Sequence, residues 1–156
     1  QDFAKNFDLK LFNTSPTKFS MDDLYSISRV ALSKLKKTNL STFMSEIGIP
    51  FEKQEAFWDM ARDNVEKRSE LKSLWKLCKE GATPLILSED KDFVKLAISM
   101  LPERPRNEKS WKDWTDKVRE ETGREGRSLY MPLRMYLTGS EKGPDMHKLF
   151  PFLENT

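Results

Sequence analysis

The sequence predicts an all-α fold with little or no β-strand. Apolar residues recur every three or four positions in several segments, which is the spacing of one helix face. Residues that favour helix caps and helix ends separate these segments, and no long stretch alternates apolar and polar residues as a strand does. With 156 residues, the chain is long enough for one ordinary domain or for two small packed subdomains.

Four helices are expected in the first half of the chain. Ser20 and Asp23 resemble a capping box, with Asp in place of the usual Glu, before a helix over residues 24–35. The apolar positions of this helix, at helical spacing, are Leu24, Ile27, Ala31 and Leu35. The other helices are expected over residues 40–47, 51–64 and 65–80. Glycine or proline follows the first and the last of these three and stops the helix there.

The segment 81–90, GATPLILSED, is the best internal boundary because it breaks the helical pattern. It divides the chain into two expected helical subdomains, residues 1–84 and 85–156. The apolar run 85–87 is too short to predict a strand without a pairing partner. The helices of the second half are expected over residues 91–101, over residues 111–121, from near Leu129, and from Pro144 toward Leu149, where proline suits a first turn.

Composition places the chain among soluble proteins of the cytoplasm. Charged residues make up 33% of the sequence, and the mean hydropathy is −0.69. No apolar run approaches the roughly 18 residues that span a membrane, and the first residues lack the apolar core of a signal peptide. A first residue of Gln rather than Met indicates a piece of a longer chain. Neither a membrane contact nor an oligomer is expected.

Catalytic motifs are missing from the sequence. It holds no glycine-rich phosphate loop, no G-x-S-x-G turn and no H-E-x-x-H helix. Cys78 lies on an apolar stripe with Leu74 and Trp75, so a buried inert thiol is expected rather than a nucleophile paired with His147. One cysteine and one histidine are also too few for a zinc site. We therefore expect no catalytic residue, metal or cofactor in this chain.

The positions of the basic residues are more informative than the net charge of +2. Lys72 and Lys76 share one stripe of the helix over residues 65–80. In the helix near Leu129, every fourth residue is a leucine, which places Arg134 on the opposite side, in line with Arg127. The leucines expected to point inward are Leu129, Leu133 and Leu137. Arginine beside glycine-rich turns suits contacts with phosphates or base edges.

Pattern alone leaves two hypotheses open: an RNA-binding helical module, and a helical module that binds another protein without RNA. Acidic residues interleave with the basic ones, which is also typical of a solvated face. Trp111 and Trp114 are three residues apart and are expected in the core rather than stacked on bases. Tyr130 and Tyr136 flank Arg134 and are the more open aromatic candidates.

The run from Glu121 to Leu153 closely resembles the C-terminal signature of bacterial glutamyl-tRNA synthetases. The matching positions are Trp114, Val118, Thr122-Gly123, Gly126-Arg127, Leu129-Tyr130, Pro132-Leu133-Arg134, Leu137-Thr138-Gly139 and Gly143-Pro144. The chain departs from the family by Glu125 for lysine, Arg127 for lysine, Tyr130 for phenylalanine and Tyr136 for alanine. Residues 7–28, with Ser15-Pro16 and Phe19, also resemble the family.

The resemblance implies the helical anticodon-binding region of such a synthetase, with glutamate-accepting tRNA as the partner. The parent enzyme would be a class I ligase that uses ATP and Mg²⁺ to attach glutamate to tRNA. This chain lacks the catalytic motifs and is expected to be inactive alone. The residues expected to contact RNA are Arg124, Arg127, Arg134, Thr138, Gly139, Lys72 and Lys76. Whether the parent also charges glutamine tRNA stays open.

Overall fold

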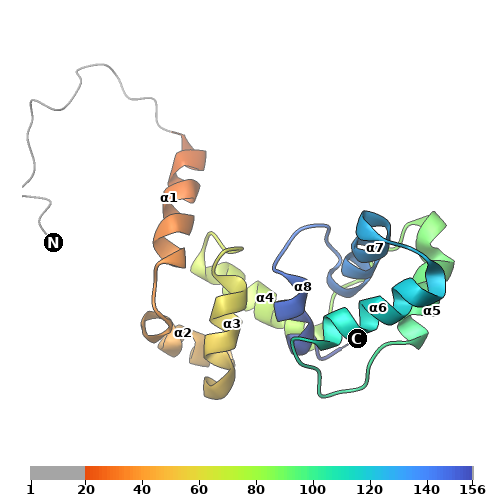
Figure 1. Cartoon of the computed structure of the whole chain (residues 1–156). Helices are drawn as coiled ribbons and strands as arrows, with labels where there is room; N and C mark the ends of the chain where they lie inside the picture. Colours follow the sequence, from red (N-terminus) through yellow and green to blue (C-terminus); the bar gives the residue numbers. More distant parts are fainter. Residues whose placement is uncertain (1–19, 156) are drawn as a thin grey trace, which may run out of the picture.

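The computed structural model describes residues 20–155, and every regular element within them is a helix (Figure 1). The predicted all-α fold is therefore confirmed. Residues 1–19, which hold the first part of the family-like segment 7–28, lie outside the described residues. None of the helices in the described part combines the length and the apolar character needed to cross a bilayer.

The first half of the chain folds into α1 (Met21–Ser33), α2 (Ser41–Glu46), α3 (Gln54–Ala61) and α4 (Arg68–Glu80). The predicted capping box is present, since the Ser20 side chain accepts from the Asp23 backbone and the Asp23 side chain accepts from Ser20. The helix predicted over residues 51–64 is shorter, because a 3₁₀ turn over Phe51–Lys53 precedes α3. Gly81 ends α4 as predicted, with a φ of 78°.

The second half contains α5 (Lys91–Ser99), α6 (Ser110–Thr122), α7 (Gly126–Thr138) and α8 (Met146–Leu149). The expectation that Pro144 starts the last helix is wrong. Asp145 is the N-cap of α8, and its side chain accepts a hydrogen bond from the backbone of His147. Pro144 therefore precedes the cap and belongs to the loop between α7 and α8.

The core of the second half is built around stacked aromatic rings. Trp114 and Phe150 are stacked with their planes 5° apart and their centroids 5.4 Å apart. Trp111 meets both rings edge-on, and the Trp114 indole nitrogen donates to the carbonyl oxygen of Ala97 at 2.9 Å. Both tryptophans are buried, which confirms their expected place in the core.

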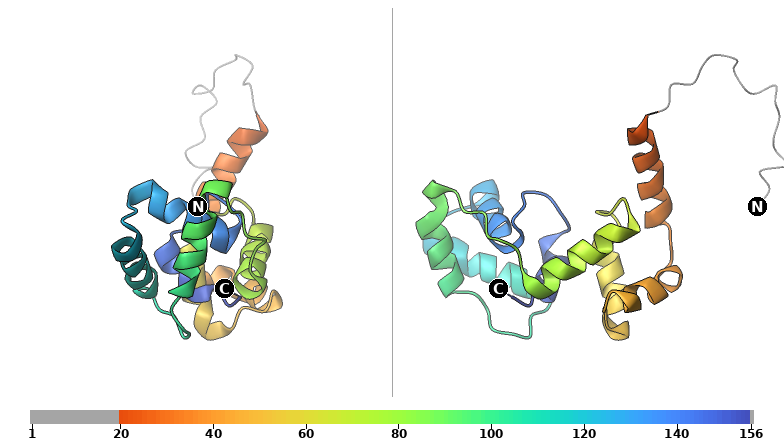
Figure 2. Two further views of the ribbon diagram at one scale, coloured as in Figure 1. Left: turned by 90° about the vertical axis from the view of Figure 1, so that its right-hand side faces the viewer. Right: turned by 180° about the vertical axis from the view of Figure 1, so that it is seen from behind.

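Helix α4 connects the two groups of helices seen in Figure 1 and, from behind, in Figure 2. After α4 the chain runs without regular structure over residues 82–87, where the Leu85 backbone nitrogen donates to the carbonyl oxygen of Met135 at 3.2 Å. The end of the chain returns to α4, and the Glu154 nitrogen donates to the carbonyl oxygen of Cys78 at 2.7 Å. Buried apolar residues of both halves form one cluster. The division into residues 1–84 and 85–156 stays a prediction.

The apolar positions that follow helical spacing on the first helix lie mostly on the surface. Leu24, Ile27 and Ala31 are all exposed, whereas Leu32 is the buried residue of α1. The helix meets the rest of the chain next to these apolar positions: the Ser28 hydroxyl donates to the Glu66 carbonyl oxygen at 2.8 Å. The spacing identified an apolar face correctly, but nothing within residues 20–155 covers it.

Candidate nucleic-acid interface

Three of the residues predicted to contact RNA lie on helix α7, whose other side is a stripe of buried leucines. Leu129, Leu133 and Leu137 are at most 1% exposed, as their four-residue spacing predicted. The helix continues through Pro132, which has no N–H to give to the carbonyl of Ser128 one turn earlier. The stripe fixes the orientation of α7 and thereby the directions of its arginines.

Arg124 lies before α7 and is engaged inside the chain. One of its terminal nitrogens, Nη1, bonds to Asp90 at 2.5 Å and donates to the Ser128 carbonyl oxygen at 3.2 Å. Its guanidinium carbon also lies 4.0 Å from the ring centroid of Phe93. The carbonyl that Pro132 leaves free is thus satisfied by Arg124. These contacts link α5 to α7, so Arg124 has a structural role. Its contact with RNA stays a prediction.

Arg127, in the first turn of α7, is the most open of the predicted arginines on this helix. Its side chain is 77% exposed, and its nearest partner is Glu141, 3.4 Å away in the loop after the helix. An ion pair between two exposed side chains contributes little to stability, in the range of about 0–1 kcal/mol. Arg127 can therefore exchange Glu141 for an external anion at little cost.

Arg134 is half-buried, so the expectation of an outward side chain in line with Arg127 is corrected. Its Nη2 donates to the carbonyl oxygen of Pro144 at 2.8 Å, in the loop that leads to α8. Nη1 is buried and has no hydrogen-bond partner within the described residues. Burial lowers the pKa of Arg134, an effect that the nearby Asp145 carboxylate opposes. The loop between α7 and α8, ten residues away, folds over the guanidinium, which the helical spacing alone does not reveal.

A hollow of about 320 Å³ opens beside the Arg134 guanidinium. Its lining combines aromatic, cationic and acidic side chains, namely Trp111, Tyr130, Arg134, Asp145, Met146 and His147. Tyr130 is 38% exposed, and its hydroxyl accepts from Arg119 at 2.7 Å. The arrangement offers the planar Tyr130 ring next to the Arg134 guanidinium, which suits an unstacked base.

Arg134 was a predicted RNA contact in this hollow and Tyr130 an aromatic candidate, whereas Trp111 was expected in the core. No RNA contact was predicted for the other three lining residues, Asp145, Met146 and His147. The Gly143-Pro144 motif before them was the available signal, because it marks a turn close to the arginine helix. Tyr136, the second aromatic candidate, is partly buried and packs against the core instead.

Thr138 and Gly139 close α7. The Thr138 hydroxyl donates to the Arg134 carbonyl oxygen at 2.8 Å and accepts from the Ser140 backbone at 3.3 Å. Gly139 has a φ of 65°, and a Cβ there would stand 2.9 Å from the Thr83 carbonyl oxygen. This turn packs against the chain's own backbone, which accounts for the glycine without a ligand. RNA contact by either residue stays a prediction.

Lys72 and Lys76 are both exposed on α4, as their stripe predicted. Lys76 pairs with Glu80 at 3.5 Å, one turn along the helix. Lys79, on the same face, bonds to Glu154 near the end of the chain. This face therefore carries cations held by weak surface pairs, and those cations are available to a polyanion.

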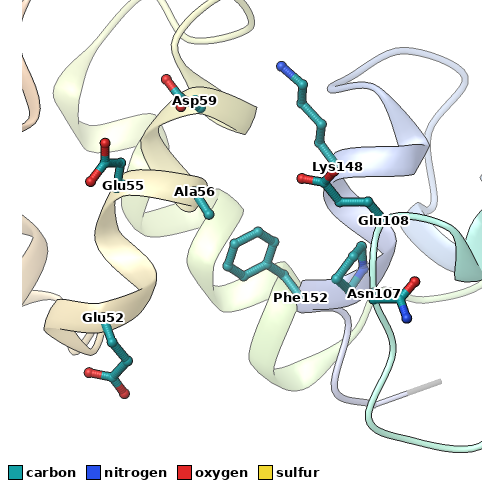
Figure 3. Close-up of a pocket in the computed structure, with 9 residues that line it drawn as sticks. Glu52, Glu55, Ala56, Asp59, Asn107, Glu108, Lys148 and Phe152 are labelled. Atoms are coloured by element: carbon teal, nitrogen blue, oxygen red, sulfur yellow. The ribbon is translucent and has the colours of Figure 1, made fainter.

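An acidic groove of about 600 Å³ lies between α3 and the segment after α8. Figure 3 shows Ala56 and Phe152 facing one another across it. Four carboxylates and one lysine stand among the lining residues, namely Glu52, Glu55, Asp59, Glu108 and Lys148. Because the carboxylates outnumber the lysine, the groove is negatively charged and repels phosphate groups. This face is therefore not expected to bind RNA.

Cys78 is fully buried, and burial raises the pKa of its thiol to about 12. The expected burial of the thiol is therefore confirmed. Within residues 20–155, no group of three or more histidine, cysteine, aspartate or glutamate side chains is placed to hold a metal ion.

The chain is similar to bacterial glutamate–tRNA ligases over nearly its whole length. It is 41% identical over 153 residues to glutamate–tRNA ligase 2 of Ruegeria sp., which covers 98% of this chain and 35% of the relative. It is 41% identical over 146 residues to glutamate–tRNA ligase 2 of Jannaschia sp., covering 94% of this chain and 32% of the relative. A ligase of Roseobacter denitrificans is 40% identical over 153 residues, 98% of this chain and 35% of its own length.

The chain thus spans about a third of the length of the curated relatives it matches. The part matched is the C-terminal region, which confirms the resemblance predicted from the motifs. No family model matches the chain.

Proposed function

Because the chain matches the C-terminal region of bacterial glutamate–tRNA ligases, we propose that it binds the anticodon arm of glutamate-accepting tRNA. The match along 98% of the chain is the observation that carries this proposal. A helical module that binds protein without RNA has no comparable support among the relatives.

The exposed cations supply the first contacts in this proposal. Arg127 at the start of α7 and Lys72 and Lys76 on α4 meet phosphates of the tRNA backbone. Phosphate contacts position a nucleic acid but do not read its sequence. Electrostatic attraction to these side chains therefore sets the affinity and its dependence on salt.

The hollow beside Arg134 supplies base recognition. An unstacked anticodon base lies against the exposed Tyr130 ring, beside the Arg134 guanidinium. The bond from Nη2 to Pro144 holds the guanidinium plane in place before RNA arrives. Half-burial of Arg134 supports this role, since a fixed donor in a sheltered hollow discriminates better than a mobile surface side chain.

In the complete ligase, ATP and Mg²⁺ would serve a catalytic region that this chain does not contain. The contribution of the chain is binding energy and orientation, which place the acceptor end of the tRNA at that catalytic region. The chain alone makes no glutamyl-tRNA and catalyses no ATP–pyrophosphate exchange. Exchange activity of the purified chain above a no-protein control would contradict this part of the proposal.

The test of the proposal is a titration of the 156-residue chain with glutamate tRNA and with an unrelated tRNA. Each titration is run at about 50 mM and about 200 mM salt, where phosphate contacts differ strongly in strength. Tighter binding of glutamate tRNA at both salt concentrations supports the proposal. Equal binding of both tRNAs, or none, would favour the protein-binding module.

A further inference from the structure

The Tyr130 hydroxyl is held by an arginine on the neighbouring helix. Helices α6 and α7 lie side by side (Figure 1), and Arg119 of α6 reaches the Tyr130 ring on α7. The Arg119 Nη2 donates to the Tyr130 hydroxyl oxygen at 2.7 Å. Arg119 is not among the residues that line the hollow beside Arg134. It therefore meets the Tyr130 ring at its hydroxyl end, next to the hollow.

This contact leaves the proton of the Tyr130 hydroxyl available to a ligand. A hydroxyl can donate as well as accept, whereas a guanidinium can only donate. The hydroxyl therefore accepts from Arg119 and directs its own proton elsewhere. Within residues 20–155 that proton has no acceptor. The bond from a charged donor also polarises the hydroxyl, which strengthens the hydrogen bond that it can donate in turn.

The Arg119 guanidinium has donors to spare as well. Its Nη1 donates to Asp116 at 2.8 Å, and Asp116 also pairs with Lys112, so one carboxylate is shared between two cations. Only two of the Arg119 N–H groups have a partner in the described part of the chain. The Arg119 side chain is 37% exposed. Its remaining donors and the Tyr130 proton can therefore reach the same group of a ligand.

A phosphate suits this pair of donors. Phosphate oxygens accept strong hydrogen bonds from arginine, and a nucleotide carries its phosphate beside its base. The Tyr130 ring offers the base a planar surface, and its centroid lies 6.4 Å from that of Trp111, which supports the ring. A base that stacks on Tyr130 in the hollow therefore brings its phosphate toward the hydroxyl end of the ring.

We propose that Arg119 and the Tyr130 hydroxyl together bind the phosphate of the nucleotide whose base stacks on the Tyr130 ring. This inference rests on the proposed function, which places an unstacked base in the hollow. Arg119 contributes the charge that the phosphate requires, and Tyr130 contributes a neutral hydrogen bond. The bond between Arg119 and Tyr130 holds both donors in place before the RNA arrives.

The test titrates four forms of the 156-residue chain with glutamate tRNA at several salt concentrations: the parent, Tyr130→Phe, Arg119→Met and the double variant. Arg119→Met lowers the affinity about tenfold and makes the log–log dependence on salt shallower by about 0.7, the value for one contact to a single strand. Tyr130→Phe keeps the ring and the salt dependence but lowers the affinity about fivefold, because the lost hydroxyl is neutral. The double variant loses less than the product of the two single losses, because both donors act on one phosphate.

Lys117→Met is the matched control. Lys117 is exposed on α6, about 200° around the helix from Arg119, so its loss removes the same charge from the opposite side. We expect its affinity and its salt dependence to stay close to those of the parent chain. Thermal melts check that each variant is folded. Tyr130→Phe removes a single atom and keeps the proposal testable if Arg119→Met does not fold.

A second tRNA separates this inference from the proposed function. Phosphate contacts do not read sequence, so Arg119→Met weakens glutamate tRNA and a tRNA with a replaced anticodon by the same factor. The preference of the parent chain for the native anticodon tests the proposed function instead. A parent chain without that preference would contradict the proposed function but not the phosphate site.

Three results would overturn the phosphate site, even in a chain that prefers the native anticodon. The first is a salt dependence of Arg119→Met equal to that of Lys117→Met. The second is full affinity of Tyr130→Phe. The third is a loss in the double variant that equals the product of the two single losses, which would place the two donors on separate groups.

Discussion

Arg134 donates from Nη2 to the carbonyl oxygen of Pro144 at 2.8 Å, and this bond joins α7 to the loop that leads into α8. A Cβ at Gly143 would lie 3.4 Å from the other terminal nitrogen, so the loop passes close over the guanidinium. Pro144 is buried beside it. Arg134 therefore fixes the position of the loop beside the hollow in which base recognition is proposed.

Replacing Arg134 with alanine is expected to affect both stability and RNA binding. Loss of its bond to the loop costs about 1–3 kcal/mol of unfolding free energy, because Pro144 then loses a charged donor. Affinity for glutamate tRNA falls about 5- to 100-fold. Chemical denaturation and tRNA titration of the same preparation measure the two effects. An unchanged affinity in a folded variant would remove Arg134 from the proposed interface.

Arg127→Ala is expected to weaken tRNA binding without loss of stability. The side chain is exposed and its pair with Glu141 contributes little, so the melting temperature stays close to that of the parent chain. Glu141→Gln is the matched control, because it breaks the same pair but leaves the arginine free for phosphate. Affinity unchanged or raised by Glu141→Gln supports the assignment. Equal weakening by both substitutions would show that the pair itself matters.

The leucine stripe of α7 is expected to determine stability. Leu133→Ala removes a fully buried side chain and costs about 2–5 kcal/mol. Met131→Ala, on the same helix at a half-buried position, is expected to cost less. Urea denaturation of the two variants makes the comparison, and similar midpoints would contradict the inward placement of the stripe.

Two glycines provide a matched test of close packing at the end of α7. Gly139 and Gly123 end their helices at almost the same φ, 65° and 67°, but a Cβ meets the Thr83 carbonyl oxygen at 2.9 Å in the first case and nothing within 4 Å in the second. Gly123→Ala is expected to cost about 1–2 kcal/mol from the left-handed conformation alone. Gly139→Ala should cost clearly more in thermal or urea unfolding. Equal costs would mean that the backbone at Thr83 moves aside freely.

The thiol of Cys78 is expected to resist modification in the folded chain. Burial raises its pKa to about 12, so the thiolate that reacts is scarce near neutral pH. The pKa of this thiol is higher in the folded chain than its ordinary value of 9.0, so the folded chain favours the neutral thiol. The stability that this preference gives is complete below pH 9 and is lost as the pH rises toward 12. A thiol reagent at pH 8 should label the chain quickly in denaturant and slowly without it. Fast labelling of the native chain would contradict the burial.

Local features of the fold were predictable from the sequence because they depend on neighbours along the chain. Ser20 and Asp23 identified the start of α1, and the four-residue spacing of Leu129, Leu133 and Leu137 identified the buried side of α7. Helix ends moved by a few residues, as at Phe51–Lys53, where a 3₁₀ turn replaces the first helical turn.

The features that the sequence did not predict depend on contacts between segments that are distant along the chain. Arg124 is engaged by Asp90, 34 residues earlier, and no helical spacing relates the two. Arg134 was expected to point outward, but the loop at Pro144 covers it. The spacing on α1 identified an apolar face, but that face is exposed, because periodicity identifies a face and not what lies against it.

Anticodon recognition by this chain is tested most directly by changing the RNA instead of the protein. The chain is titrated with glutamate tRNA and with the same tRNA in which the three anticodon bases are replaced and every other nucleotide is kept. Because the phosphate contacts are the same, any difference in affinity comes from base recognition. We predict at least a tenfold loss of affinity for the altered tRNA at constant salt. Equal affinities would contradict anticodon recognition by this chain.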